Sequence, residues 1–171
     1  TAIWFAQVVG REIHIIDYYE ASGVGLDHYV REIGKRPYVY ASHIVPHDAQ
    51  ARELGTGKSR LEVLESLGLK NLRIASMHRV EDGINAARTI IPRCWFDATR
   101  CAAGLEALAQ YRREYNQRLN VFKATPVHDV YSHGADAFRY LAVAQQQGAA
   151  PARTATGVPR WTQTADSWMG L

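Results

Sequence analysis

This chain of 171 residues has few cysteines and no long apolar run, and each of these absences excludes some classes of protein. Its two cysteines, Cys94 and Cys101, are too few for a disulfide-stabilised scaffold or a four-cysteine zinc site. No apolar run approaches the ~18 residues that cross a bilayer. No basic segment followed by an apolar core opens the sequence, so no signal peptide is expected. We therefore expect a protein of a reducing, intracellular compartment with no membrane partner.

The composition predicts one globular domain followed by a tail. Hydrophobic residues make up 47% of the chain and charged residues 22%, which are ordinary values for a globular protein. We expect residues 1–147 to form this domain. Residues 148–171 are rich in Ala, Pro, Thr and Gly, which predicts a flexible tail. Two tryptophans in this tail, Trp161 and Trp168, either dock on the domain or on a partner or stay exposed.

Charge is unevenly distributed along the chain, whose formal net charge is +3. Residues 1–50 hold four basic and six acidic side chains, whereas residues 88–123 hold seven basic and three acidic ones. Such a basic segment is typical either of a surface that holds an anionic partner or of a solvated helix face.

Hydrophobic periodicity predicts alternating strands and helices. Residues 2–9 and 12–19 predict a hairpin with its turn at Gly10 and Arg11. Further strands are expected at 38–45, 72–75 and 121–124. Helices are expected at 25–34, 60–67, 81–91, 98–115 and 133–147, the last of them capped by Ser132. This order predicts an α/β or α+β sheet protein.

The glycine-rich segment 55–59 matches a phosphate-binding loop only in part. The P-loop pattern requires a glycine five residues before its Gly-Lys-Ser, and Arg52 stands at that position. We therefore expect no ATP binding. Lys58 and Arg60 are candidates for contacts with a nucleic-acid backbone, and the alternative is an exposed basic loop.

Two carboxylates are the main candidates for chemistry. Asp48 follows the end of a predicted strand, where α/β folds place functional residues. Asp136 lies near the start of the last predicted helix, after the small residues Gly134 and Ala135, and His133 shares its face. A divalent cation relieves the repulsion between converging carboxylates. The sequence thus predicts an Mg²⁺ or Mn²⁺ site between Asp48 and Asp136, unless Asp136 merely favours the helix N-terminus.

Four segments carry a resemblance to a known family: residues 45–49, 80–88, 101–112 and 128–140. Their order and spacing resemble the nuclease domain of the large terminase subunit of tailed bacteriophages, over residues 1–145. The most specific segment is the Ser-His-Gly-Ala-Asp-Ala-Phe-Arg-Tyr of residues 132–140. The resemblance implies an α/β fold with an RNase H-like mixed sheet flanked by helices. It also implies a metal-dependent endonuclease that cuts concatemeric double-stranded DNA during viral packaging.

The resemblance further implies the composition of the site. In this family three acids hold two divalent ions, Mg²⁺ or Mn²⁺, and Asp48 and Asp136 match the second and third acids. His133 matches a position close to the metals in some relatives. One ion activates the attacking water, and the other stabilises the departing 3′ oxygen. The first acid and its central strand would lie ahead of Thr1, so we expect this polypeptide to cut DNA weakly or not at all.

The partners implied by the resemblance are double-stranded DNA, a portal, a small terminase subunit and an ATPase domain that this chain does not contain. The implied location is the cytoplasm of a bacterial host, for a phage or prophage protein. Two alternatives stay open. One is a non-catalytic DNA-binding or assembly module that uses the basic segment 88–123, and the other is an RNase H-like nuclease of the resolvase type.

Overall fold

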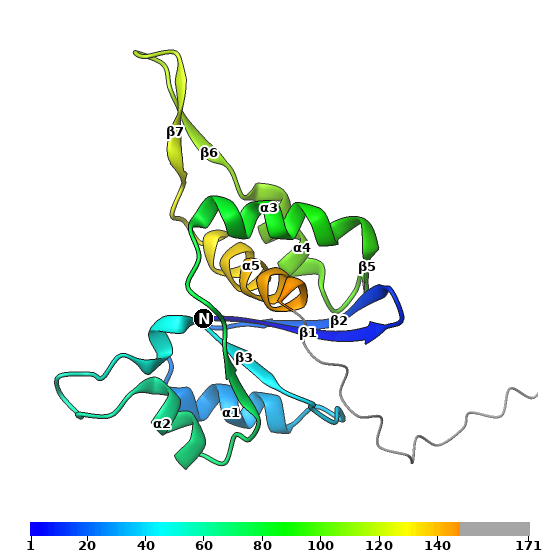
Figure 1. Ribbon diagram of the computed structural model, residues 1–171, viewed down its shortest axis with the longest axis vertical. Helices are drawn as coiled ribbons and strands as arrows, with labels where there is room; N and C mark the ends of the chain where they lie inside the picture. The colour runs from blue at the N-terminus through cyan, green and yellow to red at the C-terminus, as the bar shows by residue number, and fades with distance from the viewer. Residues whose placement is uncertain (148–171) are drawn as a thin grey trace, which may run out of the picture.

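The structure, a computed structural model, describes residues 1–147 and combines helices with three small sheets (Figure 1). The first sheet has the strand order β1-β2-β5, from β1 (Ala2–Val9), β2 (Glu12–Glu20) and β5 (Cys94–Phe96). The second pairs β3 (His43–Val45) with β4 (Leu72–Ile74), and the third pairs β6 (Arg113–Asn116) with β7 (Val121–Pro126). The predicted α/β class is therefore confirmed.

The helices cover the hairpin β1–β2 from two sides (Figure 1). On one side lie α3 (Val80–Ile90), α4 (Ala102–Gln110) and α5 (Ser132–Gln146). On the other side lie α1 (Leu26–Gly34) and α2 (Arg60–Ser66). Two short 3₁₀ helices, η1 (His47–Gln50) and η2 (Ile91–Arg93), lead out of β3 and into β5. No helix within residues 1–147 has the length and apolarity needed to span a bilayer.

The hairpin β1–β2 forms as its alternating pattern predicts. Its two-residue turn needs a positive φ, which Gly10 supplies at +61°. Ile13 and Ile15 of β2 point to the same face and are fully buried in the core. Burying both side chains contributes several kcal/mol, at about 1.5–3 kcal/mol each.

The core is closed by α5, which packs on the hairpin through aromatic rings. Phe138 is fully buried and lies 5.9 Å from Phe96 and 5.5 Å from Trp4, between ring centroids. The indole Nε1 of Trp4 donates a hydrogen bond to the carbonyl of Gly134 at 2.9 Å. A Cβ at Gly134 would lie 2.8 Å from the Cβ of Ala107, so this glycine allows α5 to approach α4. The small residues ahead of Asp136 thus serve helix packing.

Two predicted elements are shorter in the structure. The strand expected at 38–45 is limited to β3, because Tyr38 and Tyr40 instead lie against the ring of Phe5, at 5.9 and 6.1 Å. The helix expected at 98–115 ends at Gln110, and the chain continues into β6.

Two other local predictions are wrong. Ser132 does not cap α5, since its hydroxyl donates to the carbonyl of Asp129 at 2.7 Å and the N-cap is Tyr131. Asp136 consequently lies beyond the first turn of α5, where the helix dipole acts weakly.

The strand β5 was not predicted, because three residues after Pro92 carry too little periodicity.

Within residues 1–147, β1 and β3 each have a hydrogen-bonded partner on one side only. β1 pairs with β2 in an antiparallel register, and β3 pairs with β4 in a parallel one. α5 packs against both β1 and β3. The expected tail at 148–171, with Trp161 and Trp168, lies outside the described residues.

Candidate functional site

The phenol of Tyr140 occupies the centre of the candidate site. Tyr140 belongs to α5, and its hydroxyl lies 3.2 Å from Nδ1 of His47 in η1. The ring of His78, from the segment before α3, meets the Tyr140 ring edge-on at 5.0 Å between centroids. These contacts bring together three segments that are remote along the chain.

Both predicted carboxylates lie near this phenol. Burial raises the pKa of Tyr140, the negative charges of Asp48 and Asp136 raise it further, and the positive charge of Arg139 opposes them. Asp48 follows His47 directly in η1, and Asp136 precedes Tyr140 by one helical turn. The contact between His47 and Tyr140 therefore brings the elements that carry Asp48 and Asp136, η1 and α5, against each other.

Each carboxylate is engaged by an arginine. Nη1 of Arg60 donates to Oδ2 of Asp48 at 3.3 Å, and about half of both side chains is exposed. Nη2 of Arg139 donates to Oδ1 of Asp136 at 2.6 Å, and the Arg139 side chain is only 10% exposed. A buried guanidinium holds its carboxylate more firmly than an exposed one, because water screens the pair less.

Arg139 is held in place from one further direction. Its Nη1 donates to the carbonyl of Val80 at 3.5 Å, which ties α5 to the start of α3. Its Nε is buried and has no hydrogen-bond partner within the described residues. An unsatisfied buried donor costs about 1–3 kcal/mol, so this atom is a place where a ligand oxygen would be favoured.

A cavity of about 140 Å³ opens beside Asp136. Its wall includes the polar side chains of Tyr111, His128, Ser132, Asp136 and Arg139, and the base of β7 adds Thr125 and Pro126. The Tyr111 hydroxyl donates to Asp136 at 3.5 Å. Asp136 thus lies on the wall of this cavity, in contact with Tyr111 and Arg139.

Of the other predicted site residues, Arg60 contacts a carboxylate, whereas His133 and Lys58 form no hydrogen bond with either one within the described residues. His133 is exposed at the start of α5, and its ring packs edge-on against His128 at 5.7 Å. Arg60 contacts Asp48 directly and also lies 3.8 Å from Glu53. Lys58 is exposed in the loop that leads to α2.

The glycine-rich segment 55–59 ends in a helix cap. The Ser59 hydroxyl accepts the N–H of Glu62, and the Glu62 carboxylate accepts the N–H of Ser59 at 2.7 Å. This reciprocal capping box engages the hydroxyl and the N–H of Ser59 and fixes the start of α2.

The donor atoms at the site suit a hard divalent cation. Within the part of the chain that the structure describes, no group of three or more His, Cys, Asp or Glu side chains is arranged to hold a metal ion. Mg²⁺ is commonly held by one or two carboxylates together with water and substrate phosphates, so Asp48 and Asp136 fit that mode of binding. The ion would compete with Arg60 and Arg139 for the carboxylate oxygens.

Sequence reasoning missed the roles of Tyr140, Arg139 and His78 at this site. Tyr140 and Arg139 follow Asp136 at the i+4 and i+3 positions, so helical spacing was an available signal. No such signal existed for His78, which approaches because Gly83 leaves room. A Cβ at Gly83 would lie 2.8 Å from Nε2 of His78.

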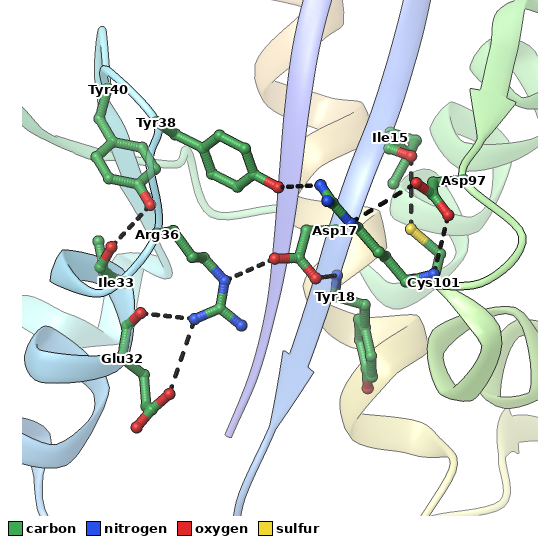
Figure 2. A network of polar contacts seen from close by, with 11 residues as sticks. Ile15, Asp17, Tyr18, Glu32, Ile33, Arg36, Tyr38, Tyr40, Asp97 and Cys101 are labelled. Atoms are coloured by element: carbon green, nitrogen blue, oxygen red, sulfur yellow. Dashed lines mark hydrogen bonds and ion pairs between the residues drawn. The ribbon is translucent and has the colours of Figure 1, made fainter.

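A second polar network joins the hairpin to α1 (Figure 2). Nε of Arg36 donates to Asp17 at 2.7 Å, and its Nη1 donates to the carbonyl of Glu32 at 2.6 Å. The same guanidinium lies 4.5 Å from the centre of the Phe5 ring. Because these contacts satisfy Asp17, this carboxylate serves the packing of α1 on the hairpin.

Comparison of the chain with protein-family models, with curated proteins and with solved structures found no match. The functional assignment therefore rests on the geometry of the site and on the sequence motifs.

Proposed function

We propose that this chain is the nuclease domain of a terminase that packages viral DNA, with an RNase H-like fold and metal-dependent endodeoxyribonuclease activity. The observation that carries the proposal is the contact between His47, which precedes Asp48 in η1, and Tyr140, which lies one turn after Asp136 in α5. The two carboxylates come from separate elements, η1 and α5, and each matches an acid of the family's pattern.

The arrangement of the strands supports the RNase H-like part of the proposal. β1 and β2 form an antiparallel hairpin, β3 and β4 form a parallel pair, and α5 packs against both β1 and β3. The free edges of β1 and β3 provide the place where the family's central strand would pair. A third acid on such a strand would complete the metal site.

The residues of the site have distinct roles in phosphodiester hydrolysis. Bound Mg²⁺ or Mn²⁺ would activate water and neutralise charge at the scissile phosphate. Asp48 and Asp136 would hold the ions, with His133 at the edge of the site. The Tyr140 phenol, whose pKa is raised by burial, stays protonated at neutral pH and keeps η1 and α5 together. Arg60 and Lys58 contact the DNA backbone on the exposed side of Asp48.

The proposed partners follow from this function. They are double-stranded DNA, a portal, a small terminase subunit and an ATPase domain on a separate segment, in the cytoplasm of a bacterial host. Asp48 and Asp136 match two of the family's three acids, so we expect slow cutting where these two act alone.

One observation favours a second candidate, a non-catalytic DNA-binding or assembly module. Arg60 and Arg139 already neutralise the two carboxylates, which lowers the need for a cation. In such a module, DNA binding would be indifferent to chelators and to substitution of Asp136.

The test is Mn²⁺-dependent nicking of supercoiled plasmid by the full chain. The proposal expects slow nicking that stops with EDTA and in Asp48→Asn and Asp136→Asn. The matched control is Asp27→Asn, because Asp27 is also an exposed carboxylate paired with an arginine, 2.6 Å from Arg31. Nicking that persists in both site variants would contradict the proposal. If the chain does not nick at all, Mn²⁺ binding by the same variants decides the question.

A further inference from the structure

The strands β6 and β7 form a ribbon that projects far beyond the body of the protein (Figure 1). Its turn is fixed locally, since Oδ1 of Asn116 accepts the N–H groups of Arg118 and Leu119 at 3.1 and 3.2 Å. Across the ribbon, the rings of Tyr115 and Phe122 meet edge-on at 5.0 Å. The arm therefore has a defined shape without support from the core.

The arm exposes several apolar side chains, whereas a ribbon with both faces in solvent ordinarily carries mostly polar ones. Exposed fractions are 46% for Tyr115, 65% for Leu119, 52% for Val121 and 63% for Phe122. Scattered apolar residues on a surface need no explanation, but four within eight residues form a patch. Such a patch indicates a contact with another molecule.

The same arm is strongly basic. Arg112, Arg113, Arg118 and Lys123 stand on it, and Glu114 is the single acid between residues 112 and 126. Three of these cations form ion pairs: Arg113 with the exposed Glu81, Lys123 with the exposed Glu114, and Arg112 with Asp129, which is about a quarter exposed. Exposed pairs of this kind contribute about 0–1 kcal/mol, so a phosphate can displace them. Arg118, in the turn, forms no ion pair within residues 1–147.

We propose that the β6–β7 arm binds double-stranded DNA by entering a groove, with its cations on phosphates and its exposed apolar side chains on the sugar and base edges. The major groove of B-DNA admits a two-stranded β-ribbon. An excess of cations around an apolar patch complements DNA, whereas a contact between copies of this chain would place like charges together. The choice of DNA as the partner rests on the proposed nuclease function.

The position of the arm links it to the candidate site. The residues at its base, Thr125, Pro126 and Val127, line the cavity that also contains Asp136. Oδ2 of Asp129, two residues further on, pairs with Arg112 at the start of the arm. DNA held by the arm would thus lie beside Asp136, so the arm is a positioning element for the cut.

The test measures the affinity of the full chain for a duplex by fluorescence anisotropy, in EDTA and over a range of salt concentrations. Loss of one phosphate contact lowers affinity about eightfold at about 0.1 M salt and reduces the slope of log K against log salt by about 0.9. We expect this result for Arg118→Ala. The matched control is Arg31→Ala, because Arg31 is exposed on α1, far from the arm, and should bind as the unaltered chain does.

A second variant, Phe122→Ser, tests the apolar part of the arm. It should weaken binding several-fold and leave the salt slope unchanged, since it removes no charge. Circular dichroism and thermal unfolding verify that each variant keeps the fold. The proposal is overturned if Arg118→Ala retains both the affinity and the salt slope of the unaltered chain. It is equally overturned if Phe122→Ser abolishes self-association in sedimentation while DNA affinity stays constant.

These outcomes are separable from those of the nuclease proposal. Binding in EDTA that depends on Arg118, without any metal-dependent cutting or Mn²⁺ binding, would retain the arm and reject the nuclease. Cutting that depends on Asp136, with arm variants that bind normally, would retain the nuclease and reject the arm.

Discussion

The hydroxyl of Tyr140 lies 3.2 Å from Nδ1 of His47, although 93 positions separate the two residues. This contact ties α5 to η1, the two elements that carry Asp136 and Asp48. The distance between the two carboxylates therefore depends on the hydroxyl of a third residue, Tyr140.

Removing only the hydroxyl tests this contact. Tyr140→Phe keeps the ring against His78 and loses the hydrogen bond to His47. We expect the free energy of unfolding to fall by about 1 kcal/mol in urea titrations. Affinity for Mn²⁺ should fall as well, because η1 and α5 are no longer held together. Tyr131→Phe is the control, since the Tyr131 hydroxyl forms no hydrogen bond within the described residues.

Gly134 is expected to tolerate no side chain. A Cβ there would lie 2.7 Å from the Tyr18 hydroxyl and 2.8 Å from the Cβ of Ala107. Gly134→Ala should lower the free energy of unfolding by about 1–3 kcal/mol, as overpacking does. Gly55→Ala, where nothing lies within 4 Å, should leave it nearly unchanged. Equal melting temperatures for the two variants would contradict the close packing of α4 and α5.

The capping box at the start of α2 should carry measurable stability. Ser59→Ala removes the acceptor of the Glu62 N–H and should cost about 1 kcal/mol. Ser66→Ala is the comparison, because the Ser66 hydroxyl only donates to the exposed carbonyl of Val63 at the other end of the helix. Thermal unfolding of both variants checks the difference, and a smaller loss for Ser59→Ala would refute the role of the cap.

The two thiols should make stability fall at high pH. Burial raises the pKa of both Cys94 and Cys101 from 9.0 to about 11. A raised pKa in the folded state favours the neutral thiol, so the contribution to stability is complete below pH 9.0. It is lost as the pH rises toward about 11, because the unfolded chain ionises first.

Urea unfolding at increasing pH measures this effect. A variant with both Cys94→Ala and Cys101→Ala should lose less stability over that range than the unaltered chain. Tyrosines with raised pKa values, such as Tyr18, are common to both proteins and cancel in the comparison. An identical decline in the two proteins would count against burial of the thiols.

Local patterns predicted the elements whose own sequence determines them. The hairpin follows from strict alternation and a glycine at its turn, and α1 begins and ends within a residue of its predicted bounds. The patterns failed where packing against a residue distant in the sequence determines the local structure. Tyr38 and Tyr40 have strand-forming character, yet they pack on Phe5 outside any sheet.

The candidate site shows the same division. Asp48 and Asp136 were accessible to sequence reasoning, because one follows a strand and the other lies in a distinctive motif. Their common neighbour Tyr140 is a product of tertiary structure, since no local spacing relates it to His47. The basic arm was likewise hidden, because helical spacing through Leu105 and Leu108 suggested that the helix continues to residue 115.

The most direct test of the account is Mn²⁺ binding by the full chain, followed by electron paramagnetic resonance of the free ion. We predict binding by the unaltered protein and by Asp27→Asn, and loss of binding in both Asp48→Asn and Asp136→Asn. Failure of the unaltered protein to bind Mn²⁺, or binding that survives either substitution at the site, would contradict a cation shared by these two carboxylates.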